Sequence, residues 1–81
     1  MHEVKLASSL REFVGGAETV SIEAASIREL LRKLVERYPR MQARVNEGIA
    51  VSINGEIYRD DRNEKIPAGA DVYLLPRIPG G

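Results

Sequence analysis

The chain contains no cysteine, a single histidine and no excess of either charge. Without cysteine, a disulfide scaffold, a thiolate nucleophile and cysteine-ligated zinc or iron–sulfur sites are excluded, so packing alone must hold the fold together. Twelve basic residues balance twelve acidic ones. This balance argues against a general affinity for nucleic acid or for anionic membranes.

Long hydrophobic runs are also missing. No stretch approaches the ~20 apolar residues that cross a bilayer, and the N-terminal residues "MHEVKLASS" lack the charged start and apolar stretch of a signal peptide. We therefore expect a cytoplasmic protein. A length of 81 residues indicates one small domain with one modest core.

Five short segments predict β-strands, because apolar and polar residues alternate in them or apolar residues run together. They cover residues 2–7, 18–23, 49–53, 57–58 and 71–76. The first two are separated by a loop containing Gly15-Gly16 and suggest an antiparallel hairpin. Asn54-Gly55 is a strong signal for a tight hairpin turn. The apolar run of the last segment suits a central strand beside the first one.

One amphipathic helix is predicted between the second and third strands. Ser26 followed by Glu29 matches a capping box, and Pro39 marks the end of the helix. The apolar positions form a single stripe: Ile27, Leu30, Leu31, Leu34, Val35 and Tyr38. The following stretch, with Met41 and Val45, is expected to be irregular.

This element order predicts an α+β domain of the β-grasp type, the architecture of ubiquitin. One main helix must cover one face of a mixed sheet of about five strands, because neither element can bury its apolar side alone. We expect residues 1–76 to form the domain and residues 77–81 to form an extended reactive C-terminal tail.

No catalytic constellation is evident inside the domain. His2 stands at the start of an edge-prone segment and is expected to be solvated. The serines have no histidine at a plausible relay position and no nucleophile-elbow motif, and no metal site is expected. The domain is therefore not predicted to be an enzyme on its own.

The tail "RIPGG" is the better candidate for a reactive site. A free carboxylate is a poor electrophile, but another enzyme can activate it with ATP. Gly80 and Gly81 lack a Cβ, so their backbone can enter a narrow active site. Pro79 fixes its own φ and biases Ile78 toward an extended conformation. Five residues after Pro76 can reach about 16 Å.

The segments "INGEIY" and "GADVYLLPRIPGG" resemble the MoaD/ThiS family of ubiquitin-like sulfur carriers. The resemblance implies that an adenylyltransferase of the ubiquitin-activating type, MoaB/MoeB- or ThiF-like, adenylates Gly81. Sulfur transfer then gives a thiocarboxylate. The chain itself is expected to bind no cofactor, whereas the activating partner uses ATP and Mg.

The resemblance is closest to the MoaD branch, which forms the small subunit of molybdopterin synthase. It implies a sulfur-donating role in molybdenum cofactor biosynthesis with a MoaE-like large subunit. Tails of that branch commonly carry two prolines after the last strand, whereas this chain has Pro76, then Arg77, and a second proline only at Pro79. Arg77 either pairs with a partner carboxylate or is solvated.

Strand parity suggests a docking surface beside the tail. If Val72 and Leu74 face the helix, Tyr73 and Leu75 face outward, where Ile57 can join them. An exposed apolar patch there would bind partners, together with Arg77, Ile78 and Pro79. The alternative is that some of these side chains complete the core.

Three other functions stay open. The chain could be a ThiS-like carrier for thiamine or for another acceptor, such as cysteine synthesis. It could be a ubiquitin-like modifier that is conjugated to target lysines through Gly81. It could also be a β-grasp interaction module whose tail is inert.

Overall fold

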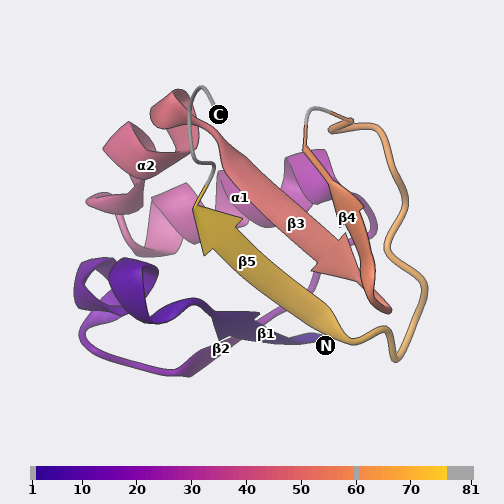
Figure 1. Cartoon of the computed structure of the whole chain (residues 1–81), viewed down its shortest axis with the longest axis horizontal. Coiled ribbons are helices and arrows are strands. Elements are labelled where there is room, and N and C mark those ends of the chain that lie inside the picture. Colours follow the sequence, from indigo (N-terminus) through magenta and orange to yellow (C-terminus); the bar gives the residue numbers. More distant parts are fainter. Residues whose placement is uncertain (1, 60, 77–81) are drawn as a thin grey trace.

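The computed structural model describes residues 2–59 and 61–76, which form one sheet with helices packed on one face (Figure 1). The strands are β1 (His2–Leu6), β2 (Thr19–Ile22), β3 (Ile49–Ile53), β4 (Glu56–Tyr58) and β5 (Val72–Pro76). The helical segments are the 3₁₀ helix η1 (Ser8–Val14) and the α-helices α1 (Ile27–Arg37) and α2 (Met41–Glu47). The five predicted strands and the predicted main helix are confirmed.

The sheet is mixed, with the strand order β2-β1-β5-β3-β4. β5 pairs with β1 in parallel and with β3 antiparallel, while β1–β2 and β3–β4 are antiparallel hairpins. The last strand is therefore central and lies beside the first strand, as predicted. This topology, with α1 across one face, is the β-grasp.

The core lies between α1 and the central strands. Side chains that alternate along β1 and β5 point toward α1, because successive side chains of a strand face opposite sides. The residues that meet there are completely inaccessible to solvent: Val4, Leu6, Leu30, Leu34, Val72 and Leu74. The apolar stripe predicted for the helix thus lies over the two strands that set the position of the chain's C-terminal end.

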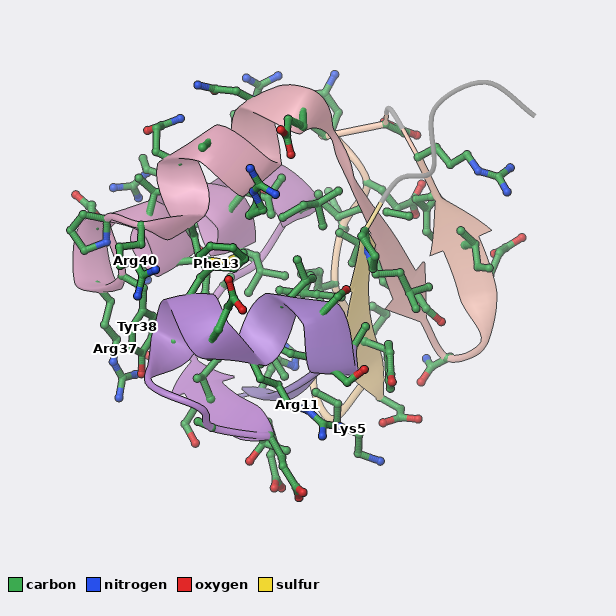
Figure 2. The ribbon with its side chains drawn as sticks, turned by 60° about the vertical axis from the view of Figure 1, so that its left-hand side comes forward. Lys5, Arg11, Phe13, Arg37, Tyr38 and Arg40 are labelled. Carbon is green, nitrogen blue, oxygen red and sulfur yellow. The ribbon has the colours of Figure 1, made fainter. Side chains whose placement is uncertain are left out.

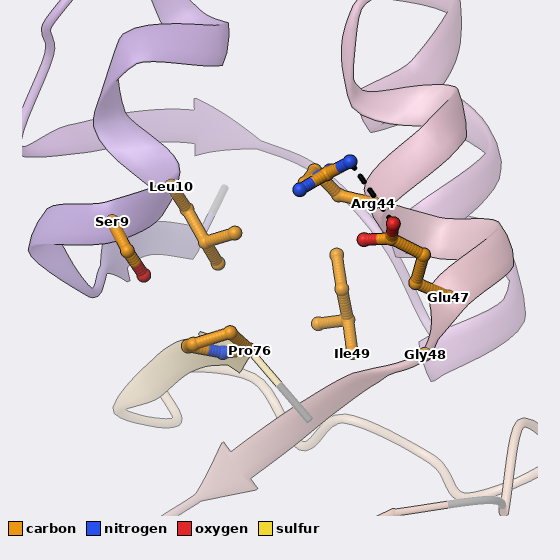
Figure 3. Close-up of a pocket in the computed structure, with 7 residues that line it drawn as sticks. All are labelled: Ser9, Leu10, Arg44, Glu47, Gly48, Ile49 and Pro76. Carbon is orange, nitrogen blue, oxygen red and sulfur yellow. Dashed lines mark hydrogen bonds and ion pairs between the residues drawn. The ribbon is translucent and has the colours of Figure 1, made fainter. Parts of the chain in front are cut away.

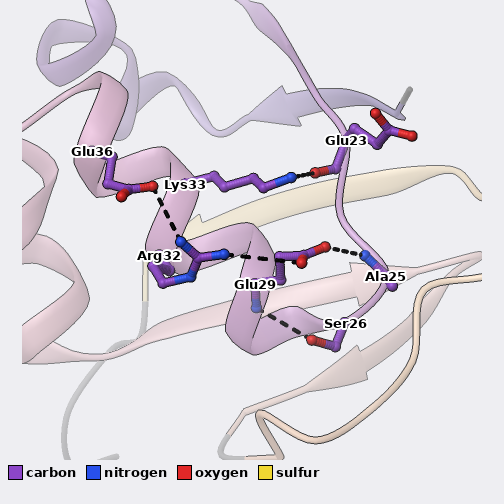
Figure 4. Close-up of polar contacts among 7 residues, drawn as sticks. All are labelled: Glu23, Ala25, Ser26, Glu29, Arg32, Lys33 and Glu36. Atoms are coloured by element: carbon purple, nitrogen blue, oxygen red, sulfur yellow. Dashed lines mark hydrogen bonds and ion pairs between the residues drawn. The ribbon is translucent and has the colours of Figure 1, made fainter.

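The start of α1 is held by reciprocal hydrogen bonds (Figure 4). The amide of Glu29 donates to Ser26 Oγ at 3.2 Å, and the Glu29 carboxylate accepts from the amide of Ala25 at 2.8 Å. The second bond reaches one residue before the N-cap, whereas an ideal capping box returns to the N-cap itself. α1 ends at Arg37, two residues before Pro39, as predicted.

Residues 41–47 form helix α2, so the expectation of an irregular stretch was wrong. Met41 and Val45 are one helical turn apart and both are buried. Gly48 then adopts a φ of 111° and its amide donates to the carbonyls of Arg44 and Val45. The helix has only two buried apolar positions, which is why hydrophobic periodicity did not predict it.

The segment after β1 is the 3₁₀ helix η1, which is followed by Gly15 as its C-cap, with a φ of 71°. Leu10 and Val14 are buried, while Phe13 is half-buried against the core. Figure 2 shows Phe13 beside Arg40, with Arg37 and Tyr38 on the same side of the molecule.

The expectation that His2 is solvated was also wrong. Only 7% of the residue is exposed, and His2 Nε2 lies 3.1 Å from the carbonyl oxygen of Ala24, to which it donates. The reason is visible in the alternation of β1: His2 shares the inward face with Val4 and Leu6. Its opposite neighbour in the sheet, Ile22, is buried as well.

The β3–β4 turn is fastened to the start of β5. Asn54 and Gly55 have φ angles of 52° and 87°, as a two-residue hairpin turn with both central residues left-handed requires. The Asn54 amide donates to the Asp71 carbonyl at 2.8 Å, and the Asp71 amide donates to Asn54 Oδ1 at 2.9 Å. These paired bonds fix where β5 begins.

Leu34→Ala should lower the free energy of unfolding by about 2–5 kcal/mol, because it leaves a cavity between α1 and the sheet. Glu36→Ala on the exposed side of the same helix should change it by less than about 0.5 kcal/mol. Urea denaturation monitored by circular dichroism measures both. Equal effects of the two substitutions would contradict this account of the core.

Candidate functional site

The candidate site is the outward face of the sheet where β5 ends. Val72 and Leu74 belong to the core, whereas Tyr73 and Leu75 lie on the other face and are half-buried. The predicted parity of the last strand is therefore confirmed, and neither Tyr73 nor Leu75 completes the core under α1.

Ile57 lies on the same outward face as Tyr73. Both residues are directly opposite Ser52 of β3, from β4 on one side and β5 on the other. With a strand spacing of about 4.8 Å, their backbones are about 10 Å apart. Ile57 is 51% exposed and is the one large hydrophobic residue among the described ones that is so open to solvent.

Charged residues border this row. Lys5 is opposite Tyr73 on the β1 side, and Lys5 Nζ lies 3.6 Å from a carboxylate oxygen of Asp71. Both side chains are more than half exposed, so this ion pair contributes little to stability. The outward face thus carries an apolar patch of Tyr73, Leu75 and Ile57, with Ser52 between Tyr73 and Ile57 and the charged pair Lys5–Asp71 on the β1 side.

A pocket of about 260 Å³ opens at the end of β5 (Figure 3). It lies between η1, α2 and the start of β3, and its lining is mixed: Ser9, Leu10, Arg44, Glu47, Gly48, Ile49 and Pro76. Arg44 and Glu47 form an ion pair at 3.1 Å on its rim. Because Pro76 is the last residue before the predicted tail, we call this pocket the tail-root pocket.

No pattern in the sequence predicted the tail-root pocket. Its polar side chains come from Ser9 of η1 and from Arg44 and Glu47 of α2, and both helical segments were missed. The one signal in the sequence for α2 was the i, i+3 spacing of Arg44 and Glu47, which is typical of a helical ion pair, followed by Gly48 as a helix C-cap.

Five of the predicted site residues, Arg77, Ile78, Pro79, Gly80 and Gly81, lie outside the described residues. The division at residue 76 and the reactive role of the tail therefore stay predictions. Among the described residues, no group of three or more histidine, aspartate or glutamate side chains could hold a metal ion. No helix in this part of the chain is long and apolar enough to cross a membrane.

Tyr58 carries the one clear perturbation of a pKa among the described groups. Its hydroxyl donates to a carboxylate oxygen of Glu56 at 2.6 Å. This hydrogen bond, with smaller contributions from partial desolvation and from nearby negative charge, raises the pKa of Tyr58 to about 12. The pair stands on edge strand β4, on either side of Ile57.

The fold and an outward apolar patch at the end of a central strand define a ubiquitin-like protein of the β-grasp type. The chain matches the ThiS family over residues 4–81. It therefore belongs to the ThiS family, whose members are ubiquitin-like sulfur carriers and modifiers that work with activating enzymes and partner proteins.

Solved structures show the same fold. SAMP1 from Haloferax volcanii has 30% sequence identity and a TM-score of 0.75, with 99% of this chain and 98% of that chain covered. In the BexX/CysO complex of Amycolatopsis orientalis, one chain has 21% identity and a TM-score of 0.79, with complete coverage of both.

A Pyrococcus furiosus protein, described provisionally as molybdopterin converting factor subunit 1, has 22% identity and a TM-score of 0.77, with 94% of this chain and 95% of that chain covered. Among curated proteins, none matches this chain significantly.

The phenol of Tyr58 should titrate near pH 12, about two pH units above an ordinary tyrosine. Because the folded state favours the neutral phenol, this group should stabilise the fold below pH 10 and lose that contribution as the pH rises toward 12. Spectrophotometric titration of tyrosinate absorbance measures it. Glu56→Gln should lower the pKa toward 10, and an unchanged value would show that Glu56 is not the cause.

Proposed function

We propose that this protein is a sulfur carrier whose C-terminal Gly81 is adenylated and then converted to a thiocarboxylate. The observation that supports this most directly is the position of β5. It is the central strand of the sheet, and it ends at Pro76, which lines the tail-root pocket and directly follows Leu75 of the outward apolar patch. Membership of the ThiS family supports the same chemistry.

The proposed reaction occurs in the active site of an activating enzyme that uses ATP and Mg²⁺. A carboxylate oxygen of Gly81 attacks the α-phosphorus of ATP, and pyrophosphate leaves. Hydrosulfide from the sulfur donor then attacks the acyl carbon, AMP leaves with the oxygen, and the product is the thiocarboxylate. The carrier supplies the substrate carboxylate and the surface that positions it, while the partner supplies the catalytic groups.

The surface that positions the tail is proposed to be the outward apolar patch of Tyr73, Leu75 and Ile57. These side chains lie outside the core under α1, so their accessible surface is available to a partner. Aromatic and aliphatic groups surrounded by polar residues are typical of the centres of protein–protein interfaces. Arg77, Ile78 and Pro79 would extend this contact along the tail.

As acceptor we propose molybdopterin synthesis, with this chain as the small subunit beside a MoaE-like large subunit. Likeness to the Pyrococcus furiosus protein supports this choice. A second candidate function is protein modification through Gly81, which the higher identity to SAMP1, named as a small archaeal modifier protein, favours. Both functions begin with the same adenylate.

Incubating the full chain with its activating enzyme, ATP, Mg²⁺ and a sulfur donor should replace one oxygen of the Gly81 carboxylate by sulfur. Intact-mass spectrometry detects this change. Removal of Gly80 and Gly81 should abolish it, since the reacting carboxylate would then belong to Pro79. If the truncated chain is thiolated as well as the full chain, Gly81 is not the reacting residue.

A separate experiment distinguishes the acceptors. Co-purification with a MoaE-type subunit supports molybdopterin synthesis, whereas a series of larger conjugates that carry this domain in cells supports protein modification.

Ile57→Ser should raise the KM of the activating enzyme for the carrier by about tenfold and leave kcat nearly unchanged, because it removes contact area from the docked complex. The free energy of unfolding should change by less than about 0.5 kcal/mol, since Ile57 is outside the core. Thr19→Ala, on the outward face at the opposite edge strand, is the matched control. An equal KM for wild type and Ile57→Ser would contradict the proposed patch.

A further inference from the structure

A second surface extends from the tail-root pocket along the side of the molecule where η1 meets the two helices. Arg44 links the two regions, because it lines the pocket with Pro76 and its guanidinium also lies 5.1 Å from the ring centroid of Phe13. Arg40 covers the same ring at 5.4 Å, and Arg37 lies 5.4 Å from the ring of Tyr38. We call the surface formed by these four residues, Phe13, Arg37, Tyr38 and Arg40, the arginine strip (Figure 2).

Arg37 and Arg40 are held in position by hydrogen bonds, but their positive charges are not paired with a carboxylate of the described residues. Arg37 donates to the carbonyl of Ser21 at 2.8 Å, and Arg40 donates to the carbonyl of Glu12 at 3.4 Å. Within residues 2–59 and 61–76, neither guanidinium is within ion-pair distance of a carboxylate, unlike Arg11, Arg32 and Arg44. Each has further N–H donors that these contacts leave unused.

Such an arrangement suits recognition of anions. A guanidinium that is already held against a ring and a carbonyl loses little conformational freedom when it binds a ligand. Its planar fork also matches the two oxygens of a carboxylate. Arg37 and Arg40, which are held in place and have no acidic partner in the described part of the chain, are therefore suited to bind an anion.

The surroundings favour carboxylates of a protein over the phosphates of a nucleic acid. Glu47, in its pair with Arg44, and Glu12 of η1 are exposed beside the strip, and a continuous phosphate backbone would meet both. Discrete Asp or Glu side chains can avoid them. A guanidinium lies against the ring of Phe13 and another against the ring of Tyr38, which reduces the ring surface that is free for base stacking.

We infer that the arginine strip binds an acidic segment of the same partner that receives the tail. This inference rests on the proposed function, because it takes the partner to be the activating enzyme. The partner would contact the carrier at two places: the outward apolar patch on the sheet and the arginine strip on the helical side. The tail-root pocket lies between these two contacts. Carboxylates facing Arg37 and Arg40 would speed association and fix the orientation of the carrier.

The direct test is a titration of the full chain, labelled with nitrogen-15, with a synthetic peptide of Glu, Asp and Gly. Amide shifts should occur at Phe13, Arg37, Tyr38 and Arg40 and should weaken as salt is added. They should be lost in Arg37→Gln/Arg40→Gln. The control Arg28→Gln/Arg62→Gln also removes two positive charges, one of them from the same helix, and should keep them.

Arg40→Gln alone should reduce the peptide shifts too, and it leaves the Arg37–Ser21 bond intact, so the test does not depend on the folding of the double variant. Absence of shifts, or equal loss in the control, overturns the inference. It is also overturned if a single-stranded oligonucleotide shifts the same amides more strongly at the same ionic strength.

The kinetic test uses the activating enzyme. Arg37→Gln/Arg40→Gln should raise KM for the carrier about tenfold with kcat nearly unchanged, and added salt should reduce the difference from wild type. An unchanged KM overturns the assignment of the partner. If the wild-type carrier is not adenylated at all, the proposed function fails, while the peptide titration still reports on the strip.

Discussion

The structure depends on the pairing of β5 with strands from two distant parts of the chain. Parallel pairing with β1 joins the two ends of the domain, and antiparallel pairing with β3 places the β3–β4 hairpin beside them. The inward side chains of β5 then complete the surface on which α1 packs. The other face of the same strand is left for Tyr73 and Leu75. One strand therefore organises both the core and the candidate site.

Much of this arrangement could be predicted because it is encoded in local patterns. The alternation in β1 and β5, the stripe of α1 and the Asn54-Gly55 turn each specify an element and its buried face. Strand parity also placed Tyr73 and Leu75 correctly. These features follow from the period of the side chains alone, which the sequence displays without any knowledge of distant contacts.

The features that were missed depend on tertiary contacts. α2 has one pair of buried residues, Met41 and Val45, and is stabilised by packing and by the Gly48 cap more than by propensity. His2 is on the inward face of β1, but its burial also needs the pairing of β1 with β2 and the carbonyl of Ala24, two residues after β2, as hydrogen-bond acceptor. The tail-root pocket and the arginine strip combine η1 with α2 or the end of α1. No local pattern relates those segments.

The division of the surface follows from the layer structure. Helices cover one face of the sheet, so the opposite face can present an apolar centre without weakening the core. On the helical side, guanidiniums cover the half-buried rings of Phe13 and Tyr38 and reach backbone carbonyls. A formally neutral protein thereby has two chemically different surfaces that meet near Pro76.

The paired hydrogen bonds between Asn54 and Asp71 have a mechanical consequence. A partner that pulls on the chain beyond Pro76 applies force along β5, parallel to its flanking strands. The ladder bonds to β1 and β3 then share this load, because they run across the direction of the force on both edges of β5. The Asn54–Asp71 bonds hold the opposite end of the strand. β5 is therefore held along both edges and at its start, so a load on its C-terminal end is shared with the rest of the sheet.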